Sequence, residues 1–273
     1  MIAPVNPHAV RPGHDWTGGP ITARATCVLC PNPSPMTLEG TNTWVLAEPG
    51  ATEAVVIDPG PLDQAHLDAV QALVEGRGMR VTLTLLTHGH DDHAQGAARF
   101  AEMTRAPVHA IGHGHADLRD GDRVSVGGLD LAVIHTPGHT RDSTCFLLPA
   151  ENALLTGDTV LGWGTTVVAW PDGVLEDYMV SLAEIDRMTG SGEVVRLLPG
   201  HGHAVQDAVG KLTYYRQHRA ERLHQIRTAI HRTGSWDPDD VVATVYADVP
   251  RELWPAARLS VLAQLDYLRD REP

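Results

Sequence analysis

Cysteine and long apolar runs are the first things that this 273-residue sequence lacks. Three cysteines (Cys27, Cys30 and Cys145) are too few for a disulfide framework, and the first two lie in an extended run, "ITARATCVLCPNP". Residues three apart on a strand face opposite sides, so we expect packing cysteines rather than a redox dithiol or half a zinc site. The first 16 residues hold no continuous apolar run, so we expect neither a signal peptide nor a membrane span, and a cytoplasmic protein.

Basic residues are also scarce. The 34 Asp and Glu residues against 21 Lys and Arg give a net charge of −13, which argues against non-specific binding to nucleic acid or anionic membranes. Apolar residues make up 42% and charged residues 20%, as is ordinary for a folded soluble protein. The length fits one large domain, or a domain of about 200 residues with a small appendage.

Histidine, in contrast, is abundant, at 16 residues. The tripeptide His-Gly-His occurs three times, in "THGHDDH" (87–93), "IGHGHADL" (111–118) and "PGHGHAV" (199–205). Five short apolar runs of the kind that forms buried strands end next to a residue type that binds metals or orients ligands. These positions are Asp58, the cluster that starts at His88, His139, Asp158 and His201. We therefore expect several strand ends to deliver side chains to one edge.

Helical patterns alternate with the strands up to about residue 198. Residues 63–76 and 92–103 have helix spacing, and alternating apolar residues on both sides of Gly127 and Gly128 predict a hairpin. The mixture of hairpins and crossover helices predicts two sheets with helices outside them, rather than one doubly wound sheet.

After residue 210 the pattern is helical only. We expect one helix over 211–233, a second that begins after the N-cap Asp237 with Pro238 in its first turn, and a third over 256–270. The sequence therefore predicts a larger domain at 1–209 and a small helical domain at 210–273.

The six residues of "HGHDDH" hold four side chains that bind metals. A turn at a strand end can direct two alternate histidines to one ion and the following Asp and His to a neighbouring ion. A catalytic ion needs about three protein ligands and an open position, so two ions need roughly six or seven. The other strand ends complete the set. It comprises His88, His90 and His139 for one ion, Asp92, His93 and His201 for the second, and Asp158 as a bridge.

In its ordered motifs the sequence resembles the metallo-β-lactamase superfamily. "THGHDDH" matches the family's H-x-H-x-D-H motif, and "IDPG", "TPGHT", "TGDT" and "PGHG" follow the family's order around the other strand-end residues. The resemblance spans most of residues 25–205. It implies a four-layer αββα sandwich and a dinuclear metal centre that usually holds zinc, with iron or manganese as alternatives.

Three further segments narrow the resemblance. "NPSPMTLEGTNTWVL", "GDTVLGWGTTVVAWPDGVLEDYMVSL" and "YYRQHRAERLHQI" are similar to the lactamase-β-like hydrolases, which carry a small C-terminal domain of the winged-helix type. The resemblance implies such a domain here, with little room for a β-wing. The best-known zinc β-lactamases have a cysteine where this chain has Asp158, which argues against antibiotic hydrolysis as the native activity.

The expected mechanism uses a hydroxide that bridges the two metal ions as the nucleophile. Asp158 would bridge the ions and offset their mutual repulsion. Asp58 is expected to accept a hydrogen bond from a ligand histidine and fix its tautomer, with a purely turn-forming Asp as the alternative. Asp92 would serve catalysis as a ligand, and Asp91 should point to solvent.

Three functions compete at this point. The leading one is a metal-dependent hydrolase of a small ester, thioester or lactone. The alternative is an endoribonuclease on single-stranded RNA, because residues 211–232 hold six Lys and Arg against one acid, although the solvent face of a helix is often basic. The third is a non-catalytic binding protein, disfavoured because all seven ligands are present. The expected partners are a small-molecule substrate, RNA in the alternative, no membrane, and a second copy if the C-terminal helices dimerise.

Three more residues and one segment complete these expectations. His203 is expected to fall outside the metal centre. The middle His-Gly-His, with His113 and His115, is interpreted as a surface loop because both ions are already served. Trp163 and Trp170 follow Asp158 and either roof the substrate pocket or fill the core.

Overall fold

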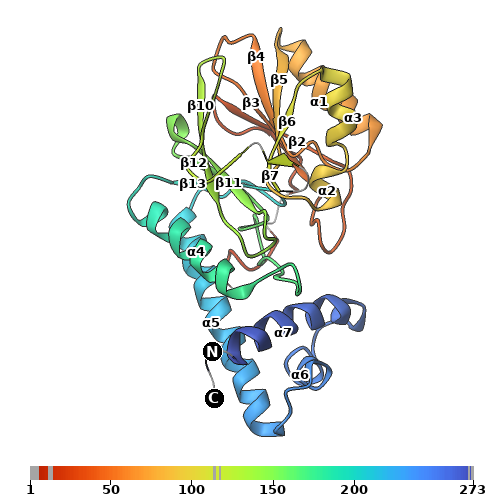
Figure 1. Ribbon diagram of the computed structural model, residues 1–273, viewed down its shortest axis with the longest axis vertical. Helices are drawn as coiled ribbons and strands as arrows, with labels where there is room; N and C mark the ends of the chain where they lie inside the picture. The colour runs from red at the N-terminus through yellow and green to blue at the C-terminus, as the bar shows by residue number, and fades with distance from the viewer. Residues whose placement is uncertain (1–5, 12–14, 113–114, 117, 270, 272–273) are drawn as a thin grey trace.

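The computed structural model describes residues 6–11, 15–112, 115–116, 118–269 and 271. Two β-sheets lie face to face, and helices cover the outer face of each (Figure 1). This confirms the predicted four-layer αββα arrangement, with a helical C-terminal part beneath it.

The first sheet has six strands in the order β1-β2-β3-β4-β5-β6, and the second has five in the order β13-β12-β11-β10-β9. The first comprises β1 (Gly19–Pro20), β2 (Ala25–Leu29), β3 (Asn42–Leu46), β4 (Glu53–Ile57), β5 (Arg80–Leu85) and β6 (Val108–His109). The second comprises β9 (Arg123–Val126), β10 (Leu129–His135), β11 (Thr144–Leu148), β12 (Ala153–Gly157) and β13 (Arg196–Pro199). A separate pair joins β7 (Ile111–Gly112) and β8 (His115–Ala116). The predicted hairpin at Gly127 and Gly128 is the turn between β9 and β10.

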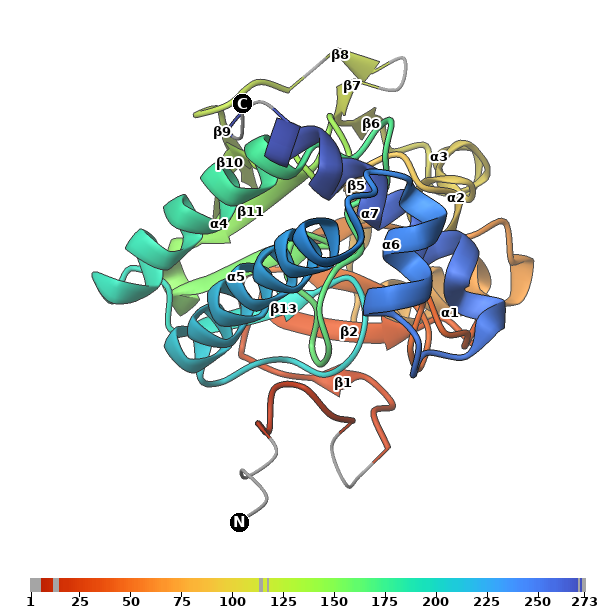
Figure 2. The ribbon, with the colours of Figure 1, turned by 90° about the horizontal axis from the view of Figure 1, so that it is seen from below.

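Helices α1 (Gln64–Gly76), α2 (Asp91–Ala94) and α3 (Ala97–Thr104) lie on the side of the first sheet, and α4 (Leu175–Gly190) and α5 (Ala208–Thr233) on that of the second (Figure 1). The C-terminal part adds α6 (Pro238–Val245), which packs against α5, and α7 (Trp254–Arg269), which packs against α6 and α4 (Figure 2). Two short 3-10 helices, η1 (Pro149–Glu151) and η2 (Arg251–Leu253), complete the elements. None of the helices in the described ranges is long and apolar enough to cross a bilayer.

The central strands bury both faces, and successive side chains serve different cores. In β3, Trp44 and Leu46 face the opposite sheet while Val45 packs with the helices outside. In β12, Leu155 faces the opposite sheet and Leu154 packs beneath α4 and α5. Because side chains alternate along a strand, a strand covered on both sides becomes continuously apolar, which is the pattern that the sequence shows.

One predicted helix is wrong in its extent. Residues 92–103 do not form a single helix, because α2 ends before Gly96 and α3 begins after it. The Gly96 nitrogen donates to the carbonyl of Gly60, and a Cβ at position 96 would lie 2.7 Å from the carbonyl oxygen of Pro61. This close approach to the loop after β4 interrupts a pattern whose periodicity alone indicates a continuous helix.

Three helices follow residue 207 as predicted, although α5 begins at Ala208 instead of 211 and α7 at Trp254 instead of 256. Helix α5 ends at Gly234, whose φ of 70° is the left-handed conformation that glycine favours at a helix end. The Asp237 carboxylate accepts from the nitrogens of Asp239 and Asp240, with Pro238 in the first turn. No strand occurs among the described residues beyond 207, so this part of the domain has no β-wing. The boundary at 209 falls in the first turn of α5 and stays a prediction.

The core beneath the second sheet continues without a break into the C-terminal part. Leu212 and Tyr215 of α5 pack in the same apolar cluster as Ile226 further along the helix, Val241 of α6 and Val261 of α7. The two parts therefore share apolar packing through α5.

A buried lysine fixes the start of α5. Lys211 is fully buried, and its Nζ donates to the carbonyl oxygens of His8 (3.1 Å), Gly162 (3.3 Å) and Gly164 (3.2 Å). Burial lowers the pKa of Lys211 to about 7. The loop after β12 is thereby tied to the first turns of the helix.

The three cysteines are buried and form no disulfide, as expected for packing residues. Burial raises the pKa of Cys30 to about 12 and that of Cys145 to about 11, so both thiols stay protonated.

Gly138 tests how tightly the loop that carries His139 packs on α4. Its φ is +136°, and an added Cβ would lie 2.2 Å from the Cα of Tyr178. Backbone strain and overpacking each cost roughly 1–3 kcal/mol, so we predict that Gly138→Ala lowers the free energy of unfolding by about 3 kcal/mol or more. Urea unfolding measures the loss.

The matched control is Gly192→Ala. Gly192 has a φ of +81° but no heavy atom within 4 Å of an added Cβ, so only the backbone term of about 1 kcal/mol applies. Equal losses in the two variants would contradict the close contact between Gly138 and α4.

Candidate metal centre

The structure brings the seven predicted ligand residues together at one edge of the two sheets. His88 follows β5, His90 lies directly before α2, and α2 carries Asp92 and His93. The other residues follow strands of the second sheet: His139 after β10, Asp158 after β12 and His201 after β13. The parallel pairs β4–β5 and β12–β13 explain this convergence, because their carboxyl ends lie at the same edge.

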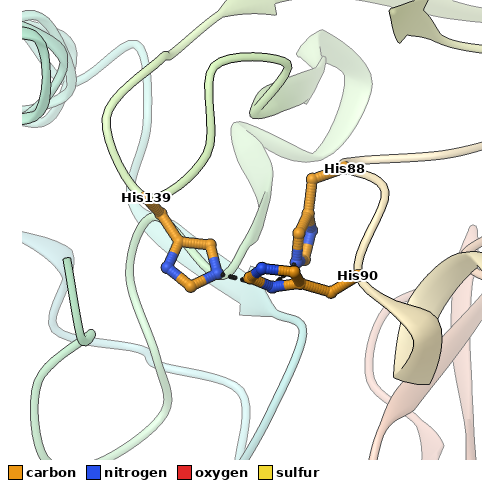
Figure 3. Close-up of side chains that lie close together, drawn as sticks. All are labelled: His88, His90 and His139. Atoms are coloured by element: carbon orange, nitrogen blue, oxygen red, sulfur yellow. Dashed lines mark hydrogen bonds between the residues drawn. The ribbon is translucent and has the colours of Figure 1, made fainter. Parts of the chain in front are cut away.

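The first group consists of three histidines. The Nδ1 atom of His90 lies 3.0 Å from Nε2 of His88 and 3.1 Å from Nε2 of His139 (Figure 3). One ring nitrogen from each residue falls within 4.8 Å of the others. Ligand atoms of a tetrahedral zinc ion lie roughly 3.4 Å apart, so these three rings fit the spacing of one ion.

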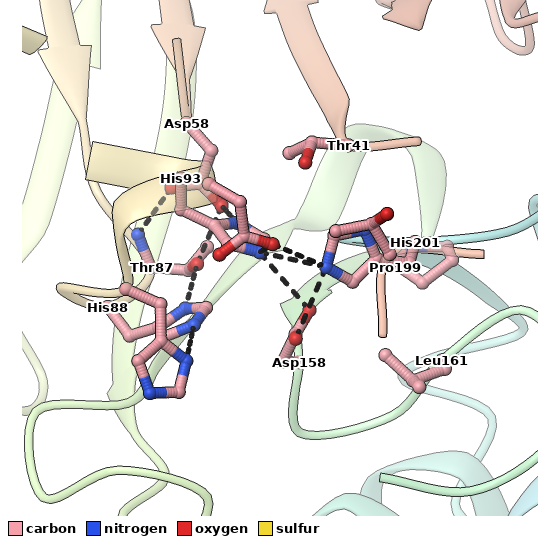
Figure 4. A network of polar contacts seen from close by, with 12 residues as sticks. Thr41, Asp58, Thr87, His88, His93, Asp158, Leu161, Pro199 and His201 are labelled. Atoms are coloured by element: carbon pink, nitrogen blue, oxygen red, sulfur yellow. Dashed lines mark hydrogen bonds and ion pairs between the residues drawn. The ribbon is translucent and has the colours of Figure 1, made fainter. Parts of the chain in front are cut away.

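The second group combines a carboxylate with two histidines. The Nε2 atoms of His93 and His201 are 3.1 Å apart (Figure 4). Oδ2 of Asp92 lies 3.2 Å from Nε2 of His201. These three residues also place one ligand atom each within 4.8 Å.

Asp158 lies between the two groups. Its Oδ2 is 3.4 Å from Nε2 of His201 and 3.7 Å from Nε2 of His139, and its Oδ1 is 3.5 Å from Nε2 of His93. The Oδ1 atom is buried, yet no hydrogen-bond donor reaches it from the described residues. A buried carboxylate oxygen without a donor is costly unless a cation binds it, so Asp158 fits a ligand shared by two ions.

Hydrogen bonds from the outer ring nitrogens fix the orientation of four histidines. Each Nδ1 meets an acceptor of the protein, and an imidazole that donates from Nδ1 keeps a lone pair on Nε2. The pairs are His88 with Oγ1 of Thr87 (3.0 Å), His93 with Oδ2 of Asp58 (2.9 Å), His139 with the carbonyl of Val167 (2.8 Å) and His201 with the carbonyl of Gly40 (3.0 Å). Four Nε2 atoms thus point into one small space, an arrangement that suits a bound cation.

The Asp58 carboxylate holds the centre from outside. It is 1% exposed and accepts from the nitrogen of Thr87 (2.7 Å), the hydroxyl of Thr87 (2.6 Å) and Nδ1 of His93. Asp58 also turns the chain, with a φ of +53°. The predicted contact to a ligand histidine is present, and the residue joins neither group of ligand atoms.

The carboxylates make one side of the centre favourable for positive charge. Burial lowers the pKa of His201, but Asp158 and Asp92 more than offset this and raise it to about 10. Burial likewise lowers the pKa of His93, and Asp158 and Asp58 raise it above its ordinary value. For Asp158, burial raises the pKa, but His201 and His93 bring it well below the ordinary range.

The three-histidine side differs. Burial, then the neighbouring His93, holds the pKa of His88 well below its usual value, and burial lowers that of His139. The rings of His88 and His139 are therefore neutral, and each can offer a lone pair to a cation.

The comparisons with known proteins agree with this geometry. The family model described as the metallo-beta-lactamase superfamily matches residues 36–122 and 110–201, and that of the beta-lactamase associated winged helix domain matches 238–272. A beta-lactamase-like protein 2 homolog from Caenorhabditis elegans is 33% identical over 248 residues, which cover 87% of this chain and 80% of that protein.

This chain belongs to the metallo-beta-lactamase superfamily. It is a hydrolase-type member with a C-terminal winged-helix domain.

The chain is also similar to an enzyme and, in its fold, to two solved structures. An atrochrysone carboxyl ACP thioesterase from Aspergillus chevalieri is 31% identical over 245 residues, 85% of this chain and 76% of that protein. A family protein from Thermus thermophilus superposes with a TM-score of 0.73 at 22% identity, covering 90% of this chain and 93% of its own. A beta-lactamase domain protein from Burkholderia ambifaria has a TM-score of 0.76 at 20% identity, covering 92% and 87%. Both structures support the fold.

One side of the metallo-beta-lactamase centre is open. His90 is exposed and the Asp92 side chain is 29% exposed, while the other five ligand candidates are buried or nearly so. Asp91 points to solvent as predicted.

Several residues that support the centre were not predicted from the sequence. The Asn42 side chain donates from Nδ2 to the carbonyls of Pro199 (2.9 Å) and Gly202 (2.7 Å), which fixes the loop of His201. Thr87 joins Asp58 to His88. Both lie in motifs that we quoted, and the position of Thr87 directly before His88 is the one signal that could have identified it.

The remaining predictions have mixed outcomes. His203 belongs to none of the candidate metal groups among the described residues. Trp163 is half-buried and its Nε1 donates to the Glu39 carboxylate (3.1 Å). Trp170 is 45% exposed, so it does not fill the core. The His113 and His115 side chains lie outside the described residues.

The contact between Asp58 and His93 predicts a loss of metal affinity in Asp58→Asn. The NH2 group of Asn cannot accept a hydrogen bond, so the side chain cannot accept from both the Thr87 nitrogen and Nδ1 of His93, and the tautomer with a free Nε2 lone pair is no longer favoured. We expect zinc affinity to fall by about 10–100-fold, measured by competition with a chromogenic chelator. Asp91→Asn, an exposed neighbour, serves as the control, and equal affinities for the two variants would contradict the role of Asp58.

Proposed function

We propose that this chain is a dinuclear zinc hydrolase of acyl thioesters. The proposal rests on the convergence of seven side chains that can bind metals. Four of them are histidines whose Nδ1 atoms are held by the protein, so that their Nε2 atoms point into one space. The thioesterase named among the relatives favours thioesters over oxygen esters and lactones.

The proposed ligands are those of the two groups, with Asp158 shared between them. A set of five imidazoles and two carboxylates suits zinc, with iron and manganese as the next candidates. When bound, two such ions polarise the carbonyl under attack and lower the pKa of a water molecule toward neutrality.

The protein's own residues keep the centre in one protonation state. Asp58 and the carbonyl of Val167 hold protons on the outer nitrogens of His93 and His139, so these rings cannot rotate or change tautomer freely. Asp92 is the most exposed carboxylate of the centre and faces its open side, where it can accept a proton from the attacking water.

The charge state of the carboxylates favours a thiol leaving group. Burial raises the pKa of Asp92, but its hydrogen bond to His201 brings the pKa below the ordinary value, and that of Asp158 is lower still. Both carboxyls are therefore ionised before the reaction. A thiol, with a pKa of about 8.5, departs as the thiolate without a proton donor, whereas an amine does not.

The structure weakens the observation on which the RNA alternative rested. Of the six basic residues at 211–232, Lys211 is fully buried and Arg219 is 4% exposed. Arg216 pairs with Asp186 of α4. The six therefore do not form one solvent-facing strip that could hold phosphates.

The expected homodimer through the C-terminal helices stays a prediction.

Turnover assays separate the three functions. We predict that zinc-loaded protein hydrolyses N-acetylcysteamine thioesters and leaves single-stranded RNA intact, with activity lost on chelation and restored by zinc. Asp92→Asn should lower kcat/KM by about 100-fold or more, because it removes a ligand and a proton acceptor. Cleavage of RNA alone would support the endoribonuclease, and zinc binding without turnover of either substrate would support a binding protein.

A further inference from the structure

A pocket of about 250 Å³ lies where the loop after β12 meets the C-terminal helices. Much of its wall is apolar and comes from both parts of the chain. These residues include Met36, Val167, Val249, Leu253, Ala256 and Ala257.

The pocket adjoins the metal centre through two hydrogen bonds. The Thr166 hydroxyl donates to the carbonyl of Asp158 (2.7 Å), and the carbonyl of Val167 accepts from Nδ1 of His139 (2.8 Å). Thr166 and Val167 both line the pocket. The pocket wall and the metal centre therefore share this loop.

The polar part of the wall is cationic. Helix α5 contributes His218, Arg219 and Arg222, and no Asp or Glu lines the pocket. Arg222 lies with its guanidinium 4.5 Å from the ring centre of Tyr246 and donates to Gln225 (2.9 Å). In a chain with a net charge of −13, a pocket with two arginines and no acid is selective for negative charge.

Two buried nitrogens of this wall lack hydrogen-bond partners among the described residues: Nδ1 of His218 and Nε of Arg219. Arg219 is only 4% exposed, and its Nη2 donates to the carbonyl of Thr166. Leaving such donors unpaired costs about 1–3 kcal/mol each, a cost that an anionic ligand would remove. Burial, with Arg219 and Arg222, lowers the pKa of His218 to about 4, so its ring is neutral at pH 7 and can donate one hydrogen bond.

We propose that this pocket binds the acyl group of the thioester and that this group ends in a carboxylate held by Arg222 and His218. The inference rests on the proposed thioesterase function and names its substrate class, a dicarboxylic acid joined to a thiol through one carboxyl. The thioester carbonyl lies at the metal centre, the apolar body contacts Val167 and Leu253, and the free carboxylate reaches the cationic wall.

Size and polarity favour the acyl group over the thiol carrier as the occupant. An apolar cavity of about 150 Å³ holds benzene, so 250 Å³ admits a chain of several carbons or one substituted ring. A carrier arm with a phosphate also bears an anion, but its amide groups need hydrogen-bond partners. The alanine, valine and leucine side chains of the wall do not supply them, and of its hydroxyl residues (Thr165, Thr166, Tyr246 and Ser260) Thr166 already donates to the carbonyl of Asp158.

The test compares matched substrates that differ in one charge. Glutaryl and adipoyl thioesters of N-acetylcysteamine are assayed beside their terminal methyl esters, and none of these carries a phosphate. We expect kcat/KM to be about 10-fold or more higher for the free acid of at least one pair, since a charge-assisted bond to arginine is lost in the ester.

Variants assign this preference to the pocket. Arg222→Met replaces the guanidinium by an apolar side chain and should bring the ratio of kcat/KM within each pair close to one. Arg222→Lys keeps a positive charge and should keep part of the preference. Arg216→Met, on the same helix but paired with Asp186 outside the pocket, should leave the ratio unchanged.

Each other outcome overturns the inference. Equal kcat/KM within every pair for the unmodified protein rejects the carboxylate but leaves the thioesterase function intact, whereas no hydrolysis of any thioester rejects both. A preference for a phosphopantetheine thioester of a neutral acyl group, lost in Arg222→Met, would assign the pocket to the carrier instead.

Discussion

The buried carboxylate of Asp58 is the interaction on which the rest of the centre depends. An ionised carboxylate that is 1% exposed is stable only if hydrogen bonds or cations compensate it. Thr87 supplies two of these hydrogen bonds and His93 the third. The carboxylate thereby joins the ends of β4 and β5 to α2, and the same three bonds set the geometry of the ligands. Folding and metal binding thus share one network.

The loop after β12 extends this network to the C-terminal part. Thr166 donates to the carbonyl of Asp158 and its own carbonyl accepts from Arg219 of α5. Tyr215 of the same helix accepts from the nitrogen of Leu161 (2.7 Å). Helix α5 therefore reaches the edge of the metal centre through backbone groups of one loop.

Much of the fold and the positions of the candidate ligands could be predicted from the sequence. Buried strands are continuously apolar, so a polar residue at the end of such a run marks the sheet edge, and His139, Asp158 and His201 were identified in this way. The break at Gly96 could not be predicted, because it depends on the approach of a loop about 35 residues away. Lys211 and Arg219 were interpreted as solvent-facing for the same reason: their partners at 162–166 lie about 50 residues distant in sequence. Periodicity shows that a helix has faces, but not what covers each face.

Helix α5 contacts three parts of the molecule and is hydrogen-bonded without a break along its length. Leu212 and Tyr215 pack on the catalytic domain, Arg222 lines the pocket, and Ile226 belongs to the C-terminal core. One inserted or deleted residue rotates everything beyond it by about 100° and moves it by about 1.5 Å along the axis. The number of residues along α5 therefore fixes how the two ends of the helix are rotated relative to each other. Chimaeras that exchange C-terminal domains between relatives can keep a working pocket only if their junction preserves that number, whatever the identity of the sequences on either side.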